Sequence, residues 1–355
     1  MERVNVKTSD PYDVLIGRGL LDRAGAETAV RLAGRNVLIV SDENTAPLYL
    51  SRAERSFREA GFSTGSFVFP AGEDHKSLAT VEKALLAADR QGLTRSDLFA
   101  ALGGGVIGDM TGLAAALYMR GVEFVQIPTT LLAMVDASVG GKTAVNLSSG
   151  KNLCGTFHQP ALVICDPDTL RSLPEEVFAE GMAEVIKHGA IGGEKALDRI
   201  SAGGDIERII AENVRIKSDV VSRDEFENGI RQVLNFGHTF GHGIEKLSGF
   251  SIYHGEGVSI GMMIAAFTAE RTGKCPKGIY DELRGLLIRA GLPVTTRFTS
   301  GQIAEAALND KKRRGEYLTV VLPEARGKCA LHKIPVSELK DLISCCDGEV
   351  TGVGH

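Results

Sequence analysis

Short apolar runs alternate with helix-forming stretches along the first half of the chain. The runs are rich in β-branched and aromatic residues and occupy 36–40, 65–70, 97–102, 122–128 and 162–166. Turn residues follow them, and the stretch 77–91 has the periodicity of a helix. Strands that are buried on both faces have uninterrupted apolar sequences of this kind. The pattern therefore predicts a mostly parallel sheet with helices on each side.

The periodicity changes near Leu173. From 175 to about 290 the apolar residues recur at helical spacing, as at Val185 and Ile186. A short strand is predicted again at 317–322, and the glycine-rich tail after Cys346 is expected to be loose. We therefore predict an α/β domain at residues 1–170 and a mainly α-helical domain at residues 171–355.

Length and composition agree with two globular domains. The chain has 355 residues, of which 43% are hydrophobic and 24% charged. Its formal charge of -5 excludes the strong basic excess of a nucleic-acid-binding protein. The most apolar stretch, 100–119, contains Asp109 and several glycines, so we expect no membrane span. Six cysteines without a C-x-x-C pair, and an N-terminus without a secretory signal pattern, predict a cytoplasmic protein with reduced thiols.

A glycine-rich loop lies between the third predicted strand and an apolar helix at 110–117. The sequence from Gly103 to Gly108 satisfies G-x-G-x-x-G, which brings backbone N–H groups to a pyrophosphate. In the usual dinucleotide fold the loop follows the first strand and an acid lies downstream, whereas the candidate acid here, Asp42, lies upstream. A glycine turn without a ligand is therefore the alternative. The segments 70–76 and 128–130 also end strands, which favours a Rossmann-like cofactor site.

Histidines gather in the second half of the chain. His238 and His242 are four residues apart and share one face if helical, and His254 follows. Three imidazoles, or two and a carboxylate such as Glu184, suit Zn²⁺ with one open position. Because Thr239 stands where zincin proteases need Glu, we do not expect a metalloprotease. The alternative for each histidine is a hydrogen-bonded, partly buried side chain, but their grouping favours a metal-binding helical domain.

Basic residues recur beside these motifs. They are Lys142, Lys151, Lys187, Lys217, Arg231, Lys311 and Lys312. Most lysines are simply solvated, but Lys187 lies one helical turn from Glu184 in an apolar stretch. The sequence G-G-K-T at Lys142 resembles the end of a P-loop, yet Asp136 stands at the position of the required first glycine. An NTPase is therefore not expected.

Taken in order, the motifs resemble those of the 3-dehydroquinate synthases, which are sugar-phosphate cyclases. The resemblance covers nearly the whole chain and is carried by the stretches 70–76, 103–109, 127–133, 135–142, 150–152, 155–160, 181–189, 224–227, Arg231, 234–242, 254–256 and 310–312. It implies NAD⁺ contacts at Asp42, Glu73, Lys76, Gly104, Gly105, Asp109, Thr129, Thr130, Asp136, Lys142 and Lys151. It also implies a divalent metal, Zn²⁺ with Co²⁺ as a substitute, held by Glu184, His238 and His254.

The remaining site residues follow from the same resemblance. His242 becomes a substrate-side or proton-transfer group rather than a ligand. The implied catalytic residues are Lys142, Lys187, Lys217, Arg231, Asn235 and His242. These also bind substrate, together with Asn152, Lys311 or Lys312, and Arg120, which reaches across a homodimer interface.

The implied substrate is 3-deoxy-D-arabino-heptulosonate 7-phosphate. Transient oxidation at C5 by NAD⁺, β-elimination of phosphate, re-reduction, ring opening and an intramolecular aldol give 3-dehydroquinate in the shikimate pathway. The reaction has no net oxidation, so the enzyme is a lyase. The alternatives are a 2-deoxy-scyllo-inosose synthase type of cyclase, expected to differ around Arg231 and Asn235, a metal-dependent polyol dehydrogenase of related fold, and a scaffold without activity.

Overall fold

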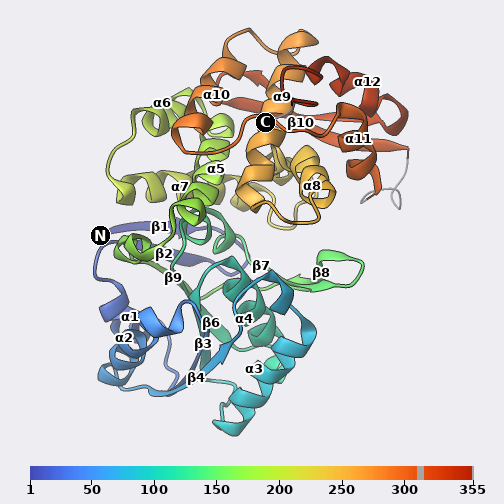
Figure 1. The fold of residues 1–355 in the computed structure, drawn as a ribbon. Helices are drawn as coiled ribbons and strands as arrows, with labels where there is room; N and C mark the ends of the chain where they lie inside the picture. The colour runs from blue at the N-terminus through green and yellow to red at the C-terminus, as the bar shows by residue number, and fades with distance from the viewer. Residues whose placement is uncertain (310–315, 354–355) are drawn as a thin grey trace. The chain divides into compact units, whose positions relative to one another are not determined.

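The computed structural model describes residues 1–309 and 316–353. They form two compact units (Figure 1): unit 1 comprises Met1–Leu173 and Ile206–Phe226, and unit 2 comprises Pro174–Asp205 and Glu227–His355. The structure differs from a single division at residue 170, because α7 (Ile206–Arg223) belongs to unit 1. This helix packs on β1 (Glu2–Val6), where the Ser218 hydroxyl donates to the Asn5 carbonyl oxygen at 3.3 Å. Helical periodicity alone does not show which core a helix joins.

Unit 1 is built on a seven-stranded sheet with the order β1-β2-β9-β6-β5-β3-β4. Its strands after β1 are β2 (Tyr12–Ile16), β3 (Asn36–Asp42), β4 (Ser63–Phe69), β5 (Leu98–Gly103), β6 (Glu123–Pro128) and β9 (Leu162–Cys165). Only the β1–β2 pair is antiparallel in this sheet, so the prediction of a mostly parallel sheet is confirmed. The strands β1 and β2 were not predicted. Strand β1 alternates polar and apolar residues at the edge of the sheet, and in β2 Tyr12 and Asp13 leave an aliphatic run of only three residues.

Both faces of this sheet are buried under helices. Leu38 and Val40 pack on the side of α3 (Leu78–Arg90) and α4 (Gly105–Leu117). Val37 and Ile39 face the opposite side, which is covered by α1 (Ala24–Ala29) and α2 (Ala46–Glu59). Because successive residues of β3 point into two different cores, the whole strand is apolar, as expected for a doubly covered parallel sheet.

The topology brings the carboxyl ends of several strands to one edge. The strand β3 has β4 on one side and β5 on the other, so the chain reverses its winding direction between β3 and β5. Ligands of open α/β sheets bind at such a point. Unit 1 also has the short helices η1 (Leu21–Arg23), η2 (Glu73–His75), η3 (Tyr118–Arg120), η4 (Ala133–Ala137) and η5 (Pro167–Ser172). Its remaining strands, β7 (Lys142–Leu147) and β8 (Gly150–Phe157), form a separate hairpin.

Unit 2 is mainly helical and surrounds α9 (His254–Arg271), whose residues 255 and 257–269 are buried. The other helices are α5 (Glu175–Ile191), α6 (Glu194–Ala202), α8 (His238–Leu247), α10 (Ile279–Arg289), α11 (Ser300–Asn309) and α12 (Leu339–Ile343), with the short helices η6 (Ile230–Asn235), η7 (Val336–Glu338) and η8 (Ser344–Cys346). A hairpin of β10 (Tyr317–Ala325) and β11 (Lys328–Pro335) packs on α9 through β10. The helix is apolar all round because unit 2 encloses it.

Glycines let α8 and α9 approach until their backbones touch. A Cβ atom at Gly261 would lie 1.9 Å from the carbonyl oxygen of Gly237 and 2.9 Å from the backbone nitrogen of Gly241. No side chain larger than hydrogen fits at this crossing. The close approach matters for the site because His238 begins α8 and His254 begins α9.

The expectation of a loose tail after Cys346 is wrong for residues 347–353. The Asp347 carboxylate accepts hydrogen bonds from the Ser300 backbone N–H at 2.9 Å and the Ser300 hydroxyl at 2.7 Å. Val350 is 0% exposed. Gly348 and Gly352 have positive φ angles, so these glycines shape tight turns.

Within residues 1–309 and 316–353, none of the helices has both the length and the apolar content that a membrane span requires.

Candidate active site

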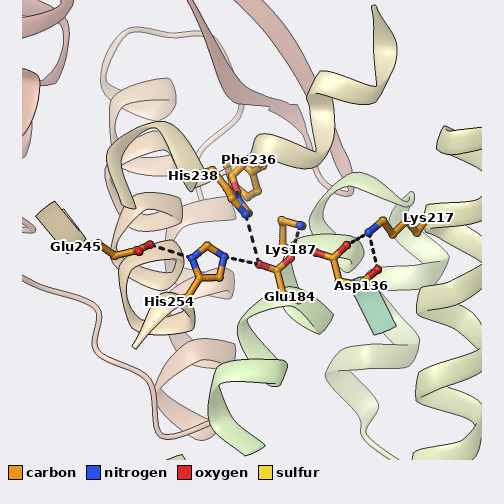
Figure 2. Close-up of polar contacts among 8 residues, drawn as sticks. All are labelled: Asp136, Glu184, Lys187, Lys217, Phe236, His238, Glu245 and His254. Atoms are coloured by element: carbon orange, nitrogen blue, oxygen red, sulfur yellow. Dashed lines mark hydrogen bonds and ion pairs between the residues drawn. The ribbon is translucent and has the colours of Figure 1, made fainter. Parts of the chain in front are cut away.

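Three residues from three helices of unit 2 face one another, as Figure 2 shows. Glu184 lies on α5, His238 begins α8 and His254 begins α9. The Glu184 Oε1 atom is 3.6 Å from His238 Nε2 and 3.7 Å from His254 Nε2. Ligands bound to Zn²⁺ at about 2.0–2.1 Å in a tetrahedron are about 3.3 Å apart. The spacing of the three atoms is therefore close to that of ligands around one ion.

His242 lies in the same group, one turn further along α8. Its ring centroid is 5.4 Å from that of His238 and 5.8 Å from that of His254. Ring nitrogen atoms of the three histidines come within 4.8 Å of one another. The geometry therefore brings together both sets considered from the sequence, three imidazoles or two imidazoles with Glu184. His242 is the exposed member of the histidine group.

Acceptors at Nδ1 orient two of the imidazoles. His238 Nδ1 is 3.2 Å from the Phe236 carbonyl oxygen, and His254 Nδ1 is 2.9 Å from Glu245 Oε1. A proton held at Nδ1 by an acceptor leaves the Nε2 lone pair free for a metal. In both residues the assigned partners thus direct Nε2 towards Glu184.

Glu245 was missed in the sequence analysis. It is buried on α8 and contacts His254 from the far side of the ring (Figure 2). Glu245 follows His238 by seven residues and His242 by three, so the three share one face of a helix. That spacing was the available signal, since a glutamate on the buried face of a helix needs a partner.

The surroundings of these rings are rich in buried charge. Glu184 and Lys187 are each 1% exposed and form an ion pair. Burial lowers the pKa of His238 well below its usual range, and the charge of Lys187 adds to this effect. For His254 burial has the same effect, but the hydrogen bond and charge of Glu245 outweigh it and raise the pKa. Burial also raises the pKa of Glu180, whose carboxylate accepts hydrogen bonds from the first N–H groups of α9.

A divalent cation would balance these charges. The carboxylates of Glu180, Glu184 and Glu245 carry three negative charges when ionised, against one positive charge on Lys187. The raised pKa of His254 reflects this excess, because the charges of Glu245, Glu184 and Glu180 favour the protonated ring. Buried charges of one sign are costly unless they are paired or coordinate a metal. The donor set of nitrogen and carboxylate oxygen atoms suits Zn²⁺.

A second polar network lies at the strand ends of unit 1. The buried Lys76 Nζ donates to Asp109 Oδ2 at 2.6 Å and to Asn152 Oδ1 at 2.5 Å. Glu73 Oε1 accepts a hydrogen bond from Asn146 Nδ2 at 2.8 Å. Burial raises the pKa of Asp109, and the charge of Lys76 opposes this shift. Four residues predicted from the resemblance are therefore linked, together with Asn146, which the sequence analysis did not single out.

The glycine loop joins β5 to the N-terminus of α4. Gly103 has a φ of +154°, and a Cβ at Gly104 would lie 3.2 Å from the Thr130 methyl carbon. The Thr129 N–H donates to the Gly103 carbonyl oxygen at 3.0 Å, which holds two strand ends together. The first N–H groups of a helix bind anions, and this helix begins at the edge where the winding direction reverses.

Two predicted aspartates end or follow strands of the same sheet. Asp42 Oδ1 accepts the Thr45 N–H at 2.8 Å, a local turn that holds the carboxylate at the end of β3. Asp136 lies in η4, a π-helix, and forms an ion pair with Lys217 of α7. The Lys217 Nζ also donates to the Asp136 carbonyl oxygen at 2.6 Å. Single-turn π-helices occur frequently at functional sites.

The other predicted residues differ in their exposure. The side chains of Lys142, Lys151 and Arg120 are exposed, and Arg120 has a positive φ of 71°, which is rare for a residue with a side chain. Arg231 is 1% exposed, and Asn235 Nδ2 donates to Glu227 Oε1 at 3.2 Å. Lys311 and Lys312 lie outside the described residues.

Comparison with known proteins decides the family. Residues 66–180 match the model of the 3-dehydroquinate synthase N-terminal domain, and residues 181–313 match that of the C-terminal domain. The chain belongs to the 3-dehydroquinate synthase family. The 3-dehydroquinate synthase of Streptococcus sanguinis is 42% identical over 343 residues, which cover 94% of this chain and 97% of that relative. The enzyme of the same name from Enterococcus faecalis is 41% identical over 342 residues, 94% of this chain and 96% of the relative. The family's enzymes are lyases, and this chain is one of them.

Solved structures support the same fold. A 2-deoxy-scyllo-inosose synthase in complex with carbaglucose-6-phosphate, NAD⁺ and Co²⁺ has a TM-score of 0.84 at 26% identity, covering 97% of this chain and 99% of that chain. A 2-epi-5-epi-valiolone synthase from Streptomyces hygroscopicus with NAD⁺ and Zn²⁺ has a TM-score of 0.82 at 27% identity, covering 96% and 98%. A probable glycerol dehydrogenase from Sinorhizobium meliloti shares the fold, with a TM-score of 0.62 at 18% identity. The match covers 94% of this chain and 96% of the dehydrogenase. These matches confirm the predicted fold class. The alternative cyclase and the dehydrogenase are less similar to this chain in sequence, at 26% and 18% identity, than the 3-dehydroquinate synthases at 41–42%.

Proposed function

We propose that the chain converts 3-deoxy-D-arabino-heptulosonate 7-phosphate into 3-dehydroquinate and phosphate, a step of the shikimate pathway. Membership of the family over both of its domains supports this function. The structural observation that carries it is the convergence of Glu184, His238 and His254 with Lys187 in unit 2. A dehydrogenase needs the ion and the cofactor, but a buried lysine beside the metal ligands suits a substrate that carries negative charge.

We infer that NAD⁺ binds at the carboxyl edge of the sheet in unit 1. The N-terminus of α4, with Gly104 and Gly105, is suited to the pyrophosphate. Asp42 at the end of β3 is suited to accept hydrogen bonds from the ribose hydroxyl groups, which favours NAD⁺ over NADP⁺. The two cyclases of similar fold both contain NAD⁺.

We infer that Glu184, His238 and His254 hold a divalent cation and that Zn²⁺ is the native ion. The orientation of both Nε2 atoms and the excess negative charge support this assignment. The similar cyclase structures contain Co²⁺ or Zn²⁺, so Co²⁺ is expected to substitute. When bound, the ion supplies Lewis acidity and the dinucleotide supplies reversible hydride acceptance.

The chain's own residues then bind and orient the substrate. Lys187 places a desolvated ammonium beside the metal ligands, where it stabilises negative charge on substrate oxygen atoms. Arg231, fully buried, is suited to a carboxylate or phosphate because guanidinium groups bind such anions with two hydrogen bonds. Lys142, Lys217, Asn152 and Asn235 are assigned to the same anionic substrate, and His242 to proton transfer. The leaving phosphate itself is suited to remove the C6 proton, which makes a carboxylate base unnecessary.

One assay separates the possible activities. The protein is incubated with the heptulosonate phosphate, NAD⁺ and Zn²⁺, and phosphate and NADH are both measured. We expect phosphate release without accumulation of NADH. Stoichiometric NADH would instead indicate a polyol dehydrogenase. Turnover of glucose 6-phosphate with an inert heptulosonate phosphate would indicate the 2-deoxy-scyllo-inosose synthase type, and an inert protein would contradict any enzymatic role.

A homodimer in which Arg120 reaches the partner subunit is also proposed. Arg120 follows two apolar residues with large exposed fractions, Leu117 at 52% and Met119 at 42%. Such a surface supports association with a second copy. Light scattering of the wild type and of Leu117→Glu tests this, since a charge at this position should produce monomers. The cytoplasmic location stays a prediction from the sequence.

A further inference from the structure

The hairpin β7–β8 is irregular at the point where it presents two predicted site residues. Val145 pairs with Cys154 and Leu147 pairs with Gly150, so Asn146 alone lies opposite the stretch 151–153. Asn152 has a φ of +56°, a left-handed conformation. Irregularities of this kind bend a strand and re-aim its side chains. Here the affected side chains include those of Lys151 and Asn152.

The side chain of Asn146 supplies the hydrogen bonds that the irregular ladder loses. Its Oδ1 accepts the Asn152 N–H at 2.8 Å, and its Nδ2 donates to Glu73 Oε1 at 2.8 Å. The Asn146 backbone N–H donates to the Lys76 carbonyl oxygen at 2.9 Å. The contact of Lys76 Nζ with Asn152 Oδ1 at 2.5 Å closes the ring. One amide thus joins the hairpin to the segment that follows β4.

We propose that Asn146 is a positioning residue of the cofactor site, which acts on Glu73 directly and, through the Asn152 N–H, on the irregular stretch that carries Lys151. The proposal rests on the proposed function, because it assigns NAD⁺ to this edge of unit 1. Val145 of β7 is buried in the core, but most of β8 is exposed and Leu147 and Leu153 are exposed, so the part of the hairpin beyond Val145 has little buried apolar surface to hold its conformation. Directed hydrogen bonds must therefore do so, and their loss should weaken NAD⁺ binding more than it destabilises the fold.

Asn146→Asp and Asn146→Ala separate the two hydrogen bonds of the amide. The aspartate substitution keeps the oxygen that accepts the Asn152 N–H, but it replaces the amide that donates to Glu73 with a carboxylate oxygen, which repels Glu73. The alanine substitution removes both groups. We expect the NAD⁺ dissociation constant, measured by isothermal titration calorimetry, to rise about tenfold or more in both variants. Asn5→Asp is the matched control, because Asn5 of β1 also donates from its Nδ2 to a carboxylate, Asp13 Oδ1 of β2, at 2.8 Å. Its dissociation constant should stay within about twofold of the wild type.

A double-mutant cycle with Glu73→Gln tests the Asn146–Glu73 contact directly. In Asn146→Asp with Glu73→Gln the roles are exchanged, since the glutamine introduced by the second substitution can donate to the new carboxylate. Asn146→Asp should therefore cost several-fold less affinity in the Glu73→Gln background than in the wild type. Equal losses in both backgrounds would show that the two residues act independently and would overturn the assignment.

A local measurement keeps the proposal testable if a variant is poorly folded. Amide hydrogen exchange at Asn152 in the NAD⁺-free protein should speed up in Asn146→Ala and remain slow in Asn146→Asp. Unchanged exchange in Asn146→Ala, or unchanged NAD⁺ affinity in both variants, refutes the positioning role alone. A wild-type protein that does not bind NAD⁺ overturns the proposed function and this assignment together.

Discussion

Replacing Gly261 by alanine tests whether the contact of α8 with α9 builds the proposed metal site. The new Cβ would lie 1.9 Å from the Gly237 carbonyl oxygen, whereas real Cβ contacts are essentially never below 3.0 Å. The two backbones must therefore separate by about 1.1 Å, the difference between these distances. The oxygen belongs to the main chain and the position of the Cβ is fixed by the backbone, so no side-chain rotation can relieve the overlap.

The structure allows the size of the effect to be estimated. Overpacking costs about 1–3 kcal/mol, and we expect the upper end, about 3 kcal/mol, because helix backbones must move. Metal-ligand distances tolerate changes of only about 0.2 Å. Since His238 and His254 begin the two displaced helices, the separation should also weaken Zn²⁺ binding, by about tenfold or more.

Two measurements check this prediction against a matched glycine. Urea unfolding gives the free energy of unfolding, and competition with a chelator gives the Zn²⁺ dissociation constant. Gly285→Ala on α10 is the control, because the nearest atom to its Cβ is Arg289 Nη1 at 3.5 Å. It should raise stability by up to about 1 kcal/mol and leave Zn²⁺ binding unchanged. If Gly261→Ala is as stable as the wild type and binds Zn²⁺ equally well, the close approach does not build the site.

Three further predictions follow from individual side chains. Glu245→Leu removes the acceptor of His254 Nδ1 and should lower the Zn²⁺ affinity about 10–100-fold in the same chelator assay. Glu245→Gln keeps an acceptor oxygen, so its Zn²⁺ affinity should fall less than that of Glu245→Leu. Burial alone would raise the pKa of Asp97, but hydrogen bonds from Thr94 and Asn36 outweigh this effect and lower the pKa to about 2. The ionised carboxylate therefore stabilises the folded state fully above the ordinary pKa of 3.8, and this contribution is lost as the pH falls through about 2. Asp97→Asn should thus be less stable than the wild type at pH 7 by about 1–2 kcal/mol, with a difference that narrows between pH 4 and pH 2 in urea unfolding; a constant difference would contradict this. Arg231→Lys keeps the charge but loses the two-bond geometry, so kcat/KM for phosphate release should fall about 100-fold or more with little change in Tm, and a variant that merely unfolds would refute the assigned role.

The sequence alone determined the features that depend on local pattern. Uninterrupted apolar runs indicated the parallel strands, because both faces of a doubly covered sheet must be buried. The spacing of His238 and His242 placed them on one helical face, and the glycine loop was placed at the end of a strand before a helix. These signals arise from residues within one or two turns of each other, which is the range that sequence periodicity reports.

Only the tertiary structure decided which distant residues meet. Asn146 and Glu245 were not recognised, because each acts on a partner that folding brings to it: Asn146 on Glu73, 73 residues away, and Glu245 on an imidazole of the next helix. The membership of α7 in unit 1 depended likewise on contacts with β1, at the other end of the unit's sequence. A single polar residue in a chain has the same local appearance whether it faces water or a buried partner. Hydrogen bonds and burial distinguish the two cases, and both exist only once the chain has folded.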